Sequence, residues 1–540
     1  MGAMVIYNAK AYLERGRFAQ ALLIQDGIIR AVGSNEGILA AAPDTAQRLD
    51  AGGRTIVPGF NDSHQHLQMV GELLGSIQLL GADSIGEVKR RVRAFIKANR
   101  PAPGTVLHGM GWNQDYFGDE HRLLTRRDLD EVCSEYPLIL ERACGHILTA
   151  NTAAMKRAGI TESTAPAEGG AIDRDENGRL TGIFRENACQ QVLCIRPPRT
   201  AETVAAQLRR AMDHAAACGV TSVQTMDLRP ADWRITLKAY EMVQRRPTLR
   251  VYHQCNFMTP AEYQAFLDAG YRTGMGDAFH RIGPLKLFVD GSLGARTAVM
   301  RQPYRDEPGT RGIATLSQEE FNELVQMAVQ NGCQVVTHAI GDGAIEQVLN
   351  GYDAVCRNGE NPLRLGVVHC QITDRPLLER FVKNHILALV QPIFLHYDMT
   401  VVEDRVGREL ASTSYAFETM RRLGIRTSFG TDSPVEDMNP IDNLYCAVTR
   451  KNLNGGPTTG FYPQECMDIC DAVDAYTAES AYVSFEENVK GRIRPGYYAD
   501  LVVLSEDIFT LAPDDLRKTK VDATLVDGRF VYQRVGHTLL

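Results

Sequence analysis

The sequence predicts an α/β fold: a (β/α)₈ TIM-like barrel with a small β-sandwich domain and an inserted subdomain. Three observations lead to this prediction. Short apolar segments alternate with amphipathic stretches through the middle of the chain. Both ends of the chain read as short strands joined by turns. About 160 residues separate the first two apolar strands of the middle region, which is far more than one loop between a strand and a helix needs.

Eight short apolar segments are the predicted barrel strands. Near-continuous apolar strands that alternate with helices indicate a parallel sheet covered on both faces, and eight such units indicate a barrel. Helical stretches such as SQEEFNELVQMAVQNG and SYAFETMRRLG lie between them, and each ends in a glycine that suits a helix C-terminus. The strands are TIVPGF (55–60), VTSVQTM (220–226), LRVYHQC (249–255), LKLFVD (285–290), QVVTHA (334–339), LGVVHC (365–370), ILALVQP (386–392) and IRTSFGTD (425–432).

The two ends of the chain share a β-rich texture. Each carries short apolar runs and an Asp-Gly pair, at 26–27 and at 527–528, which is typical of a tight hairpin turn. Since chain termini commonly lie close together, one small domain can be built from both ends. We therefore predict a composite β domain from residues 1–55 and 485–540.

The remaining residues, 56–484, are assigned to the barrel. The long gap after its first strand predicts an inserted subdomain at about 70–210. This region contains glycine-rich and polar pieces such as GMGWNQDYFGDEH and EGGAIDRDENGRLTG.

Composition excludes several classes of protein. The chain has 540 residues, is 44% hydrophobic and carries a net charge of −8 from 58 basic and 66 acidic residues, so neither its charge nor any long basic run indicates a nucleic-acid partner. It has no apolar run of about 18 residues, so we expect no membrane span. Its N-terminus lacks the pattern of a secretory signal, and its 12 cysteines are scattered without a C-x-x-C pair. We expect a cytoplasmic protein with a small-molecule substrate; a homo-oligomer stays open.

Five polar residues coincide with the C-terminal ends of predicted barrel strands, where barrel active sites form. They are His64, His66, His338, His369 and Asp432. A lone H-x-H is a weak signal, and a single histidine at a strand end is more often structural. The coincidence of five residues with four strand ends predicts one metal site. Imidazole and carboxylate together suit zinc, or alternatively iron, manganese or nickel.

Lys286 lies among apolar neighbours in the fourth predicted strand. A buried lysine without a partner is costly, so the residue calls for an explanation. It could pair with Asp290 or another carboxylate. Alternatively its amine could react with carbon dioxide to give a carbamate, an anionic bridge between two metals about 3.5–4 Å apart. The sequence leaves both readings open.

Several longer motifs add a family resemblance. The order H-x-H, lysine, histidine, histidine, aspartate resembles the amidohydrolase superfamily. The longer motifs resemble its amidohydrolase-3 branch, the YtcJ-like metal-dependent hydrolases, to which N-substituted formamide deformylases belong. The tail KGRIRPGYYADLVVL (490–504) resembles the family's return to the small β domain. The motifs are VPGFNDSHQHL (57–67), KLFVDGSLGARTA (286–298), THAIGDGA (337–344), VVHCQI (367–372) and GTDSPVEDMNP (430–440).

The resemblance implies a centre for one or two divalent ions, most simply Zn²⁺. Asp290, in the next turn, and Glu186, in the insertion, are weaker candidates for the bridging role. Carried over residue by residue, the metal ligands are His64, His66 and Asp432 for the more buried ion, His338 and His369 for the second ion, and carboxylated Lys286 as the bridge.

The predicted activity is metal-dependent hydrolysis of a C–N bond other than a peptide bond, in an amide or an N-acyl or N-formyl amine. A metal lowers the pKa of bound water to about 7, so metal-bound hydroxide attacks the carbonyl. Asp432 takes the proton and passes it to the leaving amine. The alternatives are a deaminase or a cyclic-amide or ester hydrolase on the same scaffold, and a catalytically silent barrel that binds a small molecule.

Four residues are candidates for substrate binding. Trp112, Asn113 and His146 lie in polar segments of the insertion, and Arg296 lies in GSLGART after the fourth strand. Each has a structural alternative: Trp112 could be ordinary core packing, and Arg296 could form a structural salt bridge.

Overall fold

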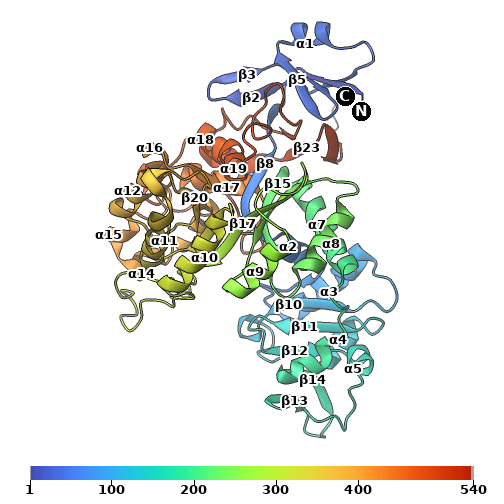
Figure 1. The fold of residues 1–540 in the computed structure, drawn as a ribbon. Helices are drawn as coiled ribbons and strands as arrows, with labels where there is room; N and C mark the ends of the chain where they lie inside the picture. Colours follow the sequence, from blue (N-terminus) through green and yellow to red (C-terminus); the bar gives the residue numbers. More distant parts are fainter. Residues whose placement is uncertain (1, 537–540) are drawn as a thin grey trace. The chain divides into compact units, whose positions relative to one another are not determined.

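The computed structural model describes residues 2–536, which form two compact units. The first unit joins the segment up to Gln68 with the segment from Ala211 onward, and the second unit is Met69–Arg210. The ribbon in Figure 1 is coloured along the sequence, so the strands from the two chain ends can be followed separately. None of the described helices is long and apolar enough to cross a membrane.

Eight parallel strands form the barrel of the first unit, as the sequence predicts. The strand order is β21-β20-β19-β18-β17-β16-β15-β8, and each neighbouring pair is parallel. Most of these strands are buried along their whole length. The strands are β8 (Phe60–Gln65), β15 (Val220–Leu228), β16 (Arg250–Cys255), β17 (His280–Phe288), β18 (Val335–Ala339), β19 (Gly366–His369), β20 (Leu387–Val390) and β21 (Thr427–Phe429).

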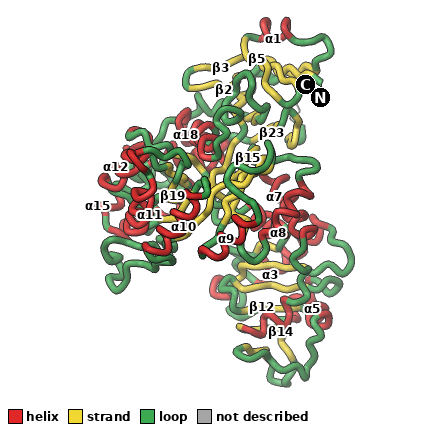
Figure 2. Tube along the Cα trace, in the orientation of Figure 1, coloured by secondary structure: helices red, strands yellow, loops and turns green. Residues whose placement is uncertain are grey.

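Amphipathic helices alternate with these strands. In α10, Ser317 and Glu320 form a capping box, and the buried face is Phe321, Leu324, Val325 and Ala328. Figure 2 shows α10, α11 and α12 on one side of the barrel strands. The helices are α8 (Trp233–Val243), α9 (Pro260–Asp268), α10 (Gln318–Gln330), α11 (Asp342–Val355), α12 (Arg375–Asn384), α16 (Phe417–Arg422) and α17 (Pro440–Thr449).

The first barrel strand starts later than the sequence analysis placed it. The predicted strand 55–60 is mostly β7 (Thr55–Pro58), which pairs with strands of the terminal domain, whereas β8 starts at Phe60. Gly59 joins the two strands, and a Cβ there would lie 2.0 Å from Oγ1 of Thr221. The chain changes from the terminal sheet to the barrel at Gly59, and only glycine leaves room for Thr221 at this point.

The strand order ends at β8 and β21, and loop and side-chain contacts join these two strands. The carboxylate of Asp62 on β8 accepts hydrogen bonds from the backbone N (3.2 Å) and Oγ1 (2.5 Å) of Thr431. The backbone N of Asp432 donates to the carbonyl of His64 at 2.8 Å. A Cβ on Gly430 would lie 2.7 Å from the backbone N of His64, so glycine permits this approach. The contacts fix the loop after β21 against β8.

The terminal domain has two sheets: one holds N-terminal strands alone, and the other joins strands from both chain ends. Asp26-Gly27 and Asp527-Gly528 have positive φ angles and join β4 to β5 and β23 to β24, so the predicted hairpin turns are confirmed. The sheet orders are β5-β4-β1-β6 and β24-β23-β22-β7-β2-β3. The remaining strands are β1 (Ala3–Tyr7), β2 (Lys10–Glu14), β3 (Arg17–Ala19), β4 (Ala21–Gln25), β5 (Ile28–Gly33), β6 (Gln47–Asp50), β22 (Leu501–Leu504), β23 (Val521–Val526) and β24 (Arg529–Gln533).

The second unit has a six-stranded sheet of its own. Its strand order is β13-β14-β12-β11-β10-β9, with α3 (Ile85–Asn99), α4 (Arg126–Val132) and α5 (Thr152–Arg157) between strands. Two apolar clusters form its core. The strands are β9 (Ile77–Gln78), β10 (Leu107–Trp112), β11 (Leu138–Arg142), β12 (Ile147–Ala150), β13 (Gly170–Arg174) and β14 (Leu180–Glu186).

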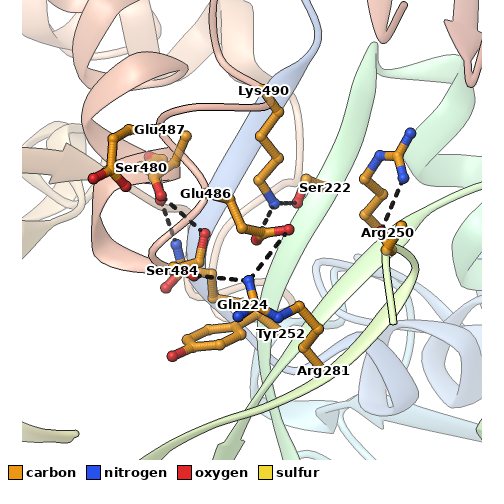
Figure 3. A network of polar contacts seen from close by, with 12 residues as sticks. Ser222, Gln224, Arg250, Tyr252, Arg281, Ser480, Ser484, Glu486, Glu487 and Lys490 are labelled. Atoms are coloured by element: carbon orange, nitrogen blue, oxygen red, sulfur yellow. Dashed lines mark hydrogen bonds and ion pairs between the residues drawn. The ribbon is translucent and has the colours of Figure 1, made fainter. Parts of the chain in front are cut away.

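A buried polar network lies near the N-terminal ends of the barrel strands (Figure 3). Nζ of Lys490 lies 2.6 Å from Oε2 of Glu486 and donates to Oγ of Ser222, near the start of β15, at 2.7 Å. Arg281 on β17 approaches the same glutamate at 3.7 Å. This network joins the segment after α19 (Ala478–Val483) to the N-terminal ends of β15 and β17, opposite the C-terminal strand ends.

Candidate metal centre

Side chains at the C-terminal strand ends converge in the first unit. His64 and Asp432 are nearly buried, and Nε2 of His64 lies 3.3 Å from Oδ1 of Asp432. Nε2 of His66 lies 3.0 Å from the same oxygen. One nitrogen from each histidine and one carboxylate oxygen lie within 4.8 Å of one another. Three donor atoms are therefore close enough to share one ion.

His369 and His338 extend this group. The ring centroids of His64 and His369 are 5.5 Å apart, and those of His369 and His338 are 4.5 Å apart. Their strands, β19 and β18, are neighbours in the barrel. The structure thus brings all four predicted histidines into one continuous cluster with Asp432.

The backbone is strained at two of these positions. His369 has a φ of 74° and Asp432 a φ of 56°, both in the left-handed region that residues with a Cβ seldom adopt. Such conformations cost about 1–3 kcal/mol and occur where the surrounding structure holds them for function. The packing around these two strand ends therefore holds both backbones in the left-handed region.

Two glutamines orient two of the histidines. Oε1 of Gln254 lies 2.6 Å from Nδ1 of His64, and Oε1 of Gln391 lies 2.7 Å from Nδ1 of His369. Because an amide oxygen only accepts, each Nδ1 carries the proton and each Nε2 presents its lone pair. Burial, aided by the charge on Lys286, lowers the pKa of His64, which favours the neutral, ligating imidazole. Burial likewise lowers the pKa of His369.

His338 is held through Nε2, whereas His64 and His369 are held through Nδ1. Its Nε2 lies 3.0 Å from the carbonyl oxygen of Gly291 and 3.3 Å from Oδ1 of Asp290. The Asp290 carboxylate also accepts from the backbone N of Val299, Ile340 and Gly341. These contacts make Asp290 a support for His338 and the turn, which weakens it further as a bridging ligand.

Lys286 on β17 is fully buried, and its Nζ has no hydrogen-bond partner among the described residues. Its Nζ lies over the ring of Phe288, 4.3 Å from the ring centroid. Burial lowers the pKa of Lys286 to about 7, although the carboxylates of Asp432 and Asp290 oppose this shift. A substantial fraction of the amine is therefore neutral near pH 7.

Comparison with known proteins places the chain in a family. The model of the amidohydrolase family matches residues 47–532. YtcJ of Bacillus subtilis, which is named as an amidohydrolase, is 31% identical over 527 residues, 97% of each chain. The chain belongs to the amidohydrolase family.

Two further proteins are similar over nearly the whole chain. The N-substituted formamide deformylase of Arthrobacter pascens is 27% identical over 551 residues, 98% of each chain. The solved structure of an uncharacterized metal-dependent hydrolase from Pyrococcus horikoshii has a TM-score of 0.75 and 27% sequence identity, and the match covers 95% of this chain and 99% of that one.

The amidohydrolase family and its metal-dependent hydrolase neighbours imply a divalent metal, and the residues fit one. Two buried polar atoms of the site lack hydrogen-bond partners among the described residues: Nδ1 of His66 and Nζ of Lys286. Buried polar atoms are rarely left unsatisfied, so a group that fills this space accounts for them. Imidazole nitrogens and a carboxylate are the donors that zinc and similar metals take.

The predicted substrate residues of this amidohydrolase fall in different surroundings. Arg296 pairs with Asp306 at 2.8 Å and with Glu307 at 3.3 Å, so its guanidinium is engaged in the structural salt bridge that the sequence offered as an alternative. Trp112 is fully buried in the core of the second unit, and its Nε1 donates to the carbonyl of Leu140. These contacts match the structural alternatives that the sequence offered, and substrate roles for Arg296 and Trp112 stay predictions.

Two other candidates also lie in the second unit. Oδ1 of Asn113 accepts from the backbone N of Asp115 and from Arg142. The exposed His146 pairs through Nδ1 with Oε2 of Glu186 at 2.9 Å, and this contact raises the pKa of His146. Substrate roles for Asn113 and His146, and a bridging role for Glu186, stay predictions.

Sequence reasoning missed Gln254 and Gln391. Both are uncharged polar residues near a strand end: Gln254 is the next-to-last residue of β16, beside His253, and Gln391 directly follows the apolar strand β20. The same rule that selected the histidines could have selected them, because polar residues at barrel strand ends face the site.

Proposed function

We propose that this amidohydrolase hydrolyses a C–N bond of a small molecule, an amide or an N-acyl or N-formyl amine. The single observation that carries the proposal is the convergence of Nε2 of His64 and His66 on Oδ1 of Asp432, at 3.3 and 3.0 Å. The similarity to an N-substituted formamide deformylase supports the N-formyl class. The metal-dependent hydrolase with which it shares its fold supports the reaction type.

The proposed metal is zinc, in one or two positions. His64, His66 and Asp432 would hold the first ion, and His338 and His369 the second. When bound, the metal would lower the pKa of a water molecule and polarise the scissile carbonyl. The glutamine contacts keep the two Nε2 lone pairs directed into the site, which supports this assignment.

Lys286 is the proposed bridge. Its neutral amine would attack carbon dioxide, forming an N–C bond and releasing one proton, and the product is an anionic carbamate. A buried amine with a pKa lowered to about 7 is suited to this reaction, because the neutral form is the nucleophile. The carbamate would replace a buried amine in the cluster by an anionic group with two further oxygen ligands.

Asp432 is the proposed proton carrier. Its carboxylate would accept the proton of the attacking water as the new C–O bond forms, then donate that proton to the nitrogen as the C–N bond breaks. The nitrogen then leaves as a neutral amine. The hydrogen bond from the backbone N of Asp432 to the carbonyl of His64 holds this residue against β8 during both transfers.

A substrate panel tests the proposal. Zinc-reconstituted protein would be assayed for amine release from N-formyl amines, N-acyl amines and amino-acid amides, and for turnover of esters, cyclic amides and aminopurines. We expect turnover in the amide and N-acyl or N-formyl group, and Asp432→Asn is the matched control. Activity confined to the other groups would replace this substrate class by a deaminase or an ester or cyclic-amide hydrolase. No turnover by metal-loaded protein would favour the silent barrel.

A further inference from the structure

A second group of metal-binding side chains lies outside the candidate centre. His214 and Cys218 stand at the C-terminal end of α7 (Ala201–Ala217), and Asp437 lies in the loop after β21. One donor atom from each lies within 4.8 Å of the others. We propose that His214, Cys218 and Asp437 form a second, sulfur-containing site for a zinc-type divalent ion.

The spacing on the helix suits a shared ion. Residues four apart lie on the same face of a helix, and Nε2 of His214 is 3.8 Å from Sγ of Cys218. Zinc bonds of about 2.3 Å to sulfur and about 2.0 Å to nitrogen place the two donors about 3.5 Å apart in a tetrahedron. The observed pair needs to close by only a few tenths of an ångström.

The same distance also suits a weak contact between a thiol and an imidazole, so the pair alone does not define a site. The third group distinguishes the two. Asp437 comes from a segment more than 200 residues away in sequence and brings a carboxylate within reach of both donors. Thiolate, imidazole and carboxylate together are a zinc donor set, and three protein ligands leave one position for water.

The local charge favours a cation. The carboxylates of Asp437 and Asp442 both lie close enough to Cys218 to interact with it electrostatically. A divalent ion would offset these negative groups and stabilise the thiolate, so binding would release the thiol proton. In the candidate centre described above, every donor is nitrogen or oxygen, so sulfur marks this second site chemically.

The bound ion would cross-link two parts of the first unit, the end of α7 and the loop after β21. Asp437 is five residues beyond Asp432 in the same loop, and its Oδ1 accepts a hydrogen bond from the backbone N of Asn439, just before α17. An ion shared with His214 and Cys218 would fasten this loop to the end of α7. The proposal does not depend on the substrate class.

Cobalt substitution tests the proposal in the full-length protein. Co²⁺ bound by a thiolate gives a charge-transfer absorption that nitrogen and oxygen ligands do not give. We expect this band in the wild type, its loss in Cys218→Ser, and no change in the control Cys470→Ser, which alters another half-buried cysteine. The visible d–d absorption of the sulfur-free centre should persist in Cys218→Ser. No sulfur band in the wild type, or an unchanged band in Cys218→Ser, would overturn the proposal.

A second measurement avoids changing the cysteine. Zinc should protect Cys218 from alkylation by iodoacetamide. Mass spectrometry of the peptide that contains Cys218 measures the alkylated fraction. Since loss of even an outer hydrogen bond weakens metal sites about 10–100-fold, removing a ligand in Asp437→Asn or His214→Ala should raise the zinc concentration needed for protection at least about tenfold. Equal protection in both variants and the wild type would contradict a shared ion.

Discussion

Nδ1 of His64 lies 2.6 Å from Oε1 of Gln254, a residue 190 positions later in the chain. The contact holds the imidazole with Nε2 directed toward Asp432. Gln254→Ala should therefore weaken metal binding about 10–100-fold, because such supporting hydrogen bonds fix the ligand's tautomer and orientation. Competition with a chromophoric chelator measures the change. Gln254→Glu, which still accepts from Nδ1, should retain most of the affinity, and equal loss in both variants would contradict an orienting role.

Asp432→Asn tests the proton carrier. The amide cannot accept and return a proton, so we expect kcat to fall about 100-fold or more. Steady-state assays with the best substrate of the panel measure the loss, and metal analysis of the same sample separates failed proton transfer from failed metal binding. Near-normal kcat in a metal-loaded variant would refute the assignment.

Lys286→Ala tests the carbamate bridge. Without the bridge we expect the protein to retain fewer ions after gel filtration than the wild type, measured by inductively coupled plasma mass spectrometry. Lys286→Glu supplies a carboxylate in place of the carbamate and should recover part of the metal content. Two tightly held ions in the alanine variant would show that Lys286 is not a metal bridge.

Lys490→Met tests the buried network at the N-terminal ends of the barrel strands. The variant leaves the Glu486 carboxylate, which is 6% exposed in the native structure, without its closest cation. Breaking a buried ion pair costs about 3–5 kcal/mol, so the free energy of unfolding should fall by about that amount. The double variant Lys490→Met/Glu486→Leu should recover most of the loss in urea unfolding. A double variant less stable than either single variant would contradict this account.

Asp398 should make stability depend on pH. Burial raises its pKa to about 6 from 3.8, although Oδ2 accepts a hydrogen bond from the Tyr415 hydroxyl at 2.7 Å. The folded state therefore holds a proton that the unfolded state releases, so this residue lowers stability as pH rises from about 4 through 6. The two pKa values correspond to about 3 kcal/mol over that window.

Asp398→Asn isolates this contribution. The stability of the wild type minus that of the variant should become more negative between pH 4 and pH 7, measured by urea unfolding at each pH. A difference that does not change with pH would mean that folding does not raise the pKa of Asp398.

The amino-acid sequence by itself determined the barrel and the residues that converge at its mouth. Seven of the eight predicted strands share three or more residues with an observed barrel strand, and 55–60 shares only Phe60 with β8, because buried parallel strands are continuous apolar runs that neighbouring residues define. Histidine and aspartate at strand ends could be found in the same way, since all C-terminal ends of a parallel barrel meet on one face.

Tertiary structure decided which partners these residues meet. The contact between His64 and Gln254 depends on strand order and register, and no local pattern encodes a pairing across 190 positions. The need for glycine at position 59 depends on the closeness of Thr221. Arg296 is engaged by Asp306 because a loop folds back on itself. Periodicity reports what one segment buries, whereas the packed fold alone sets the distances between segments.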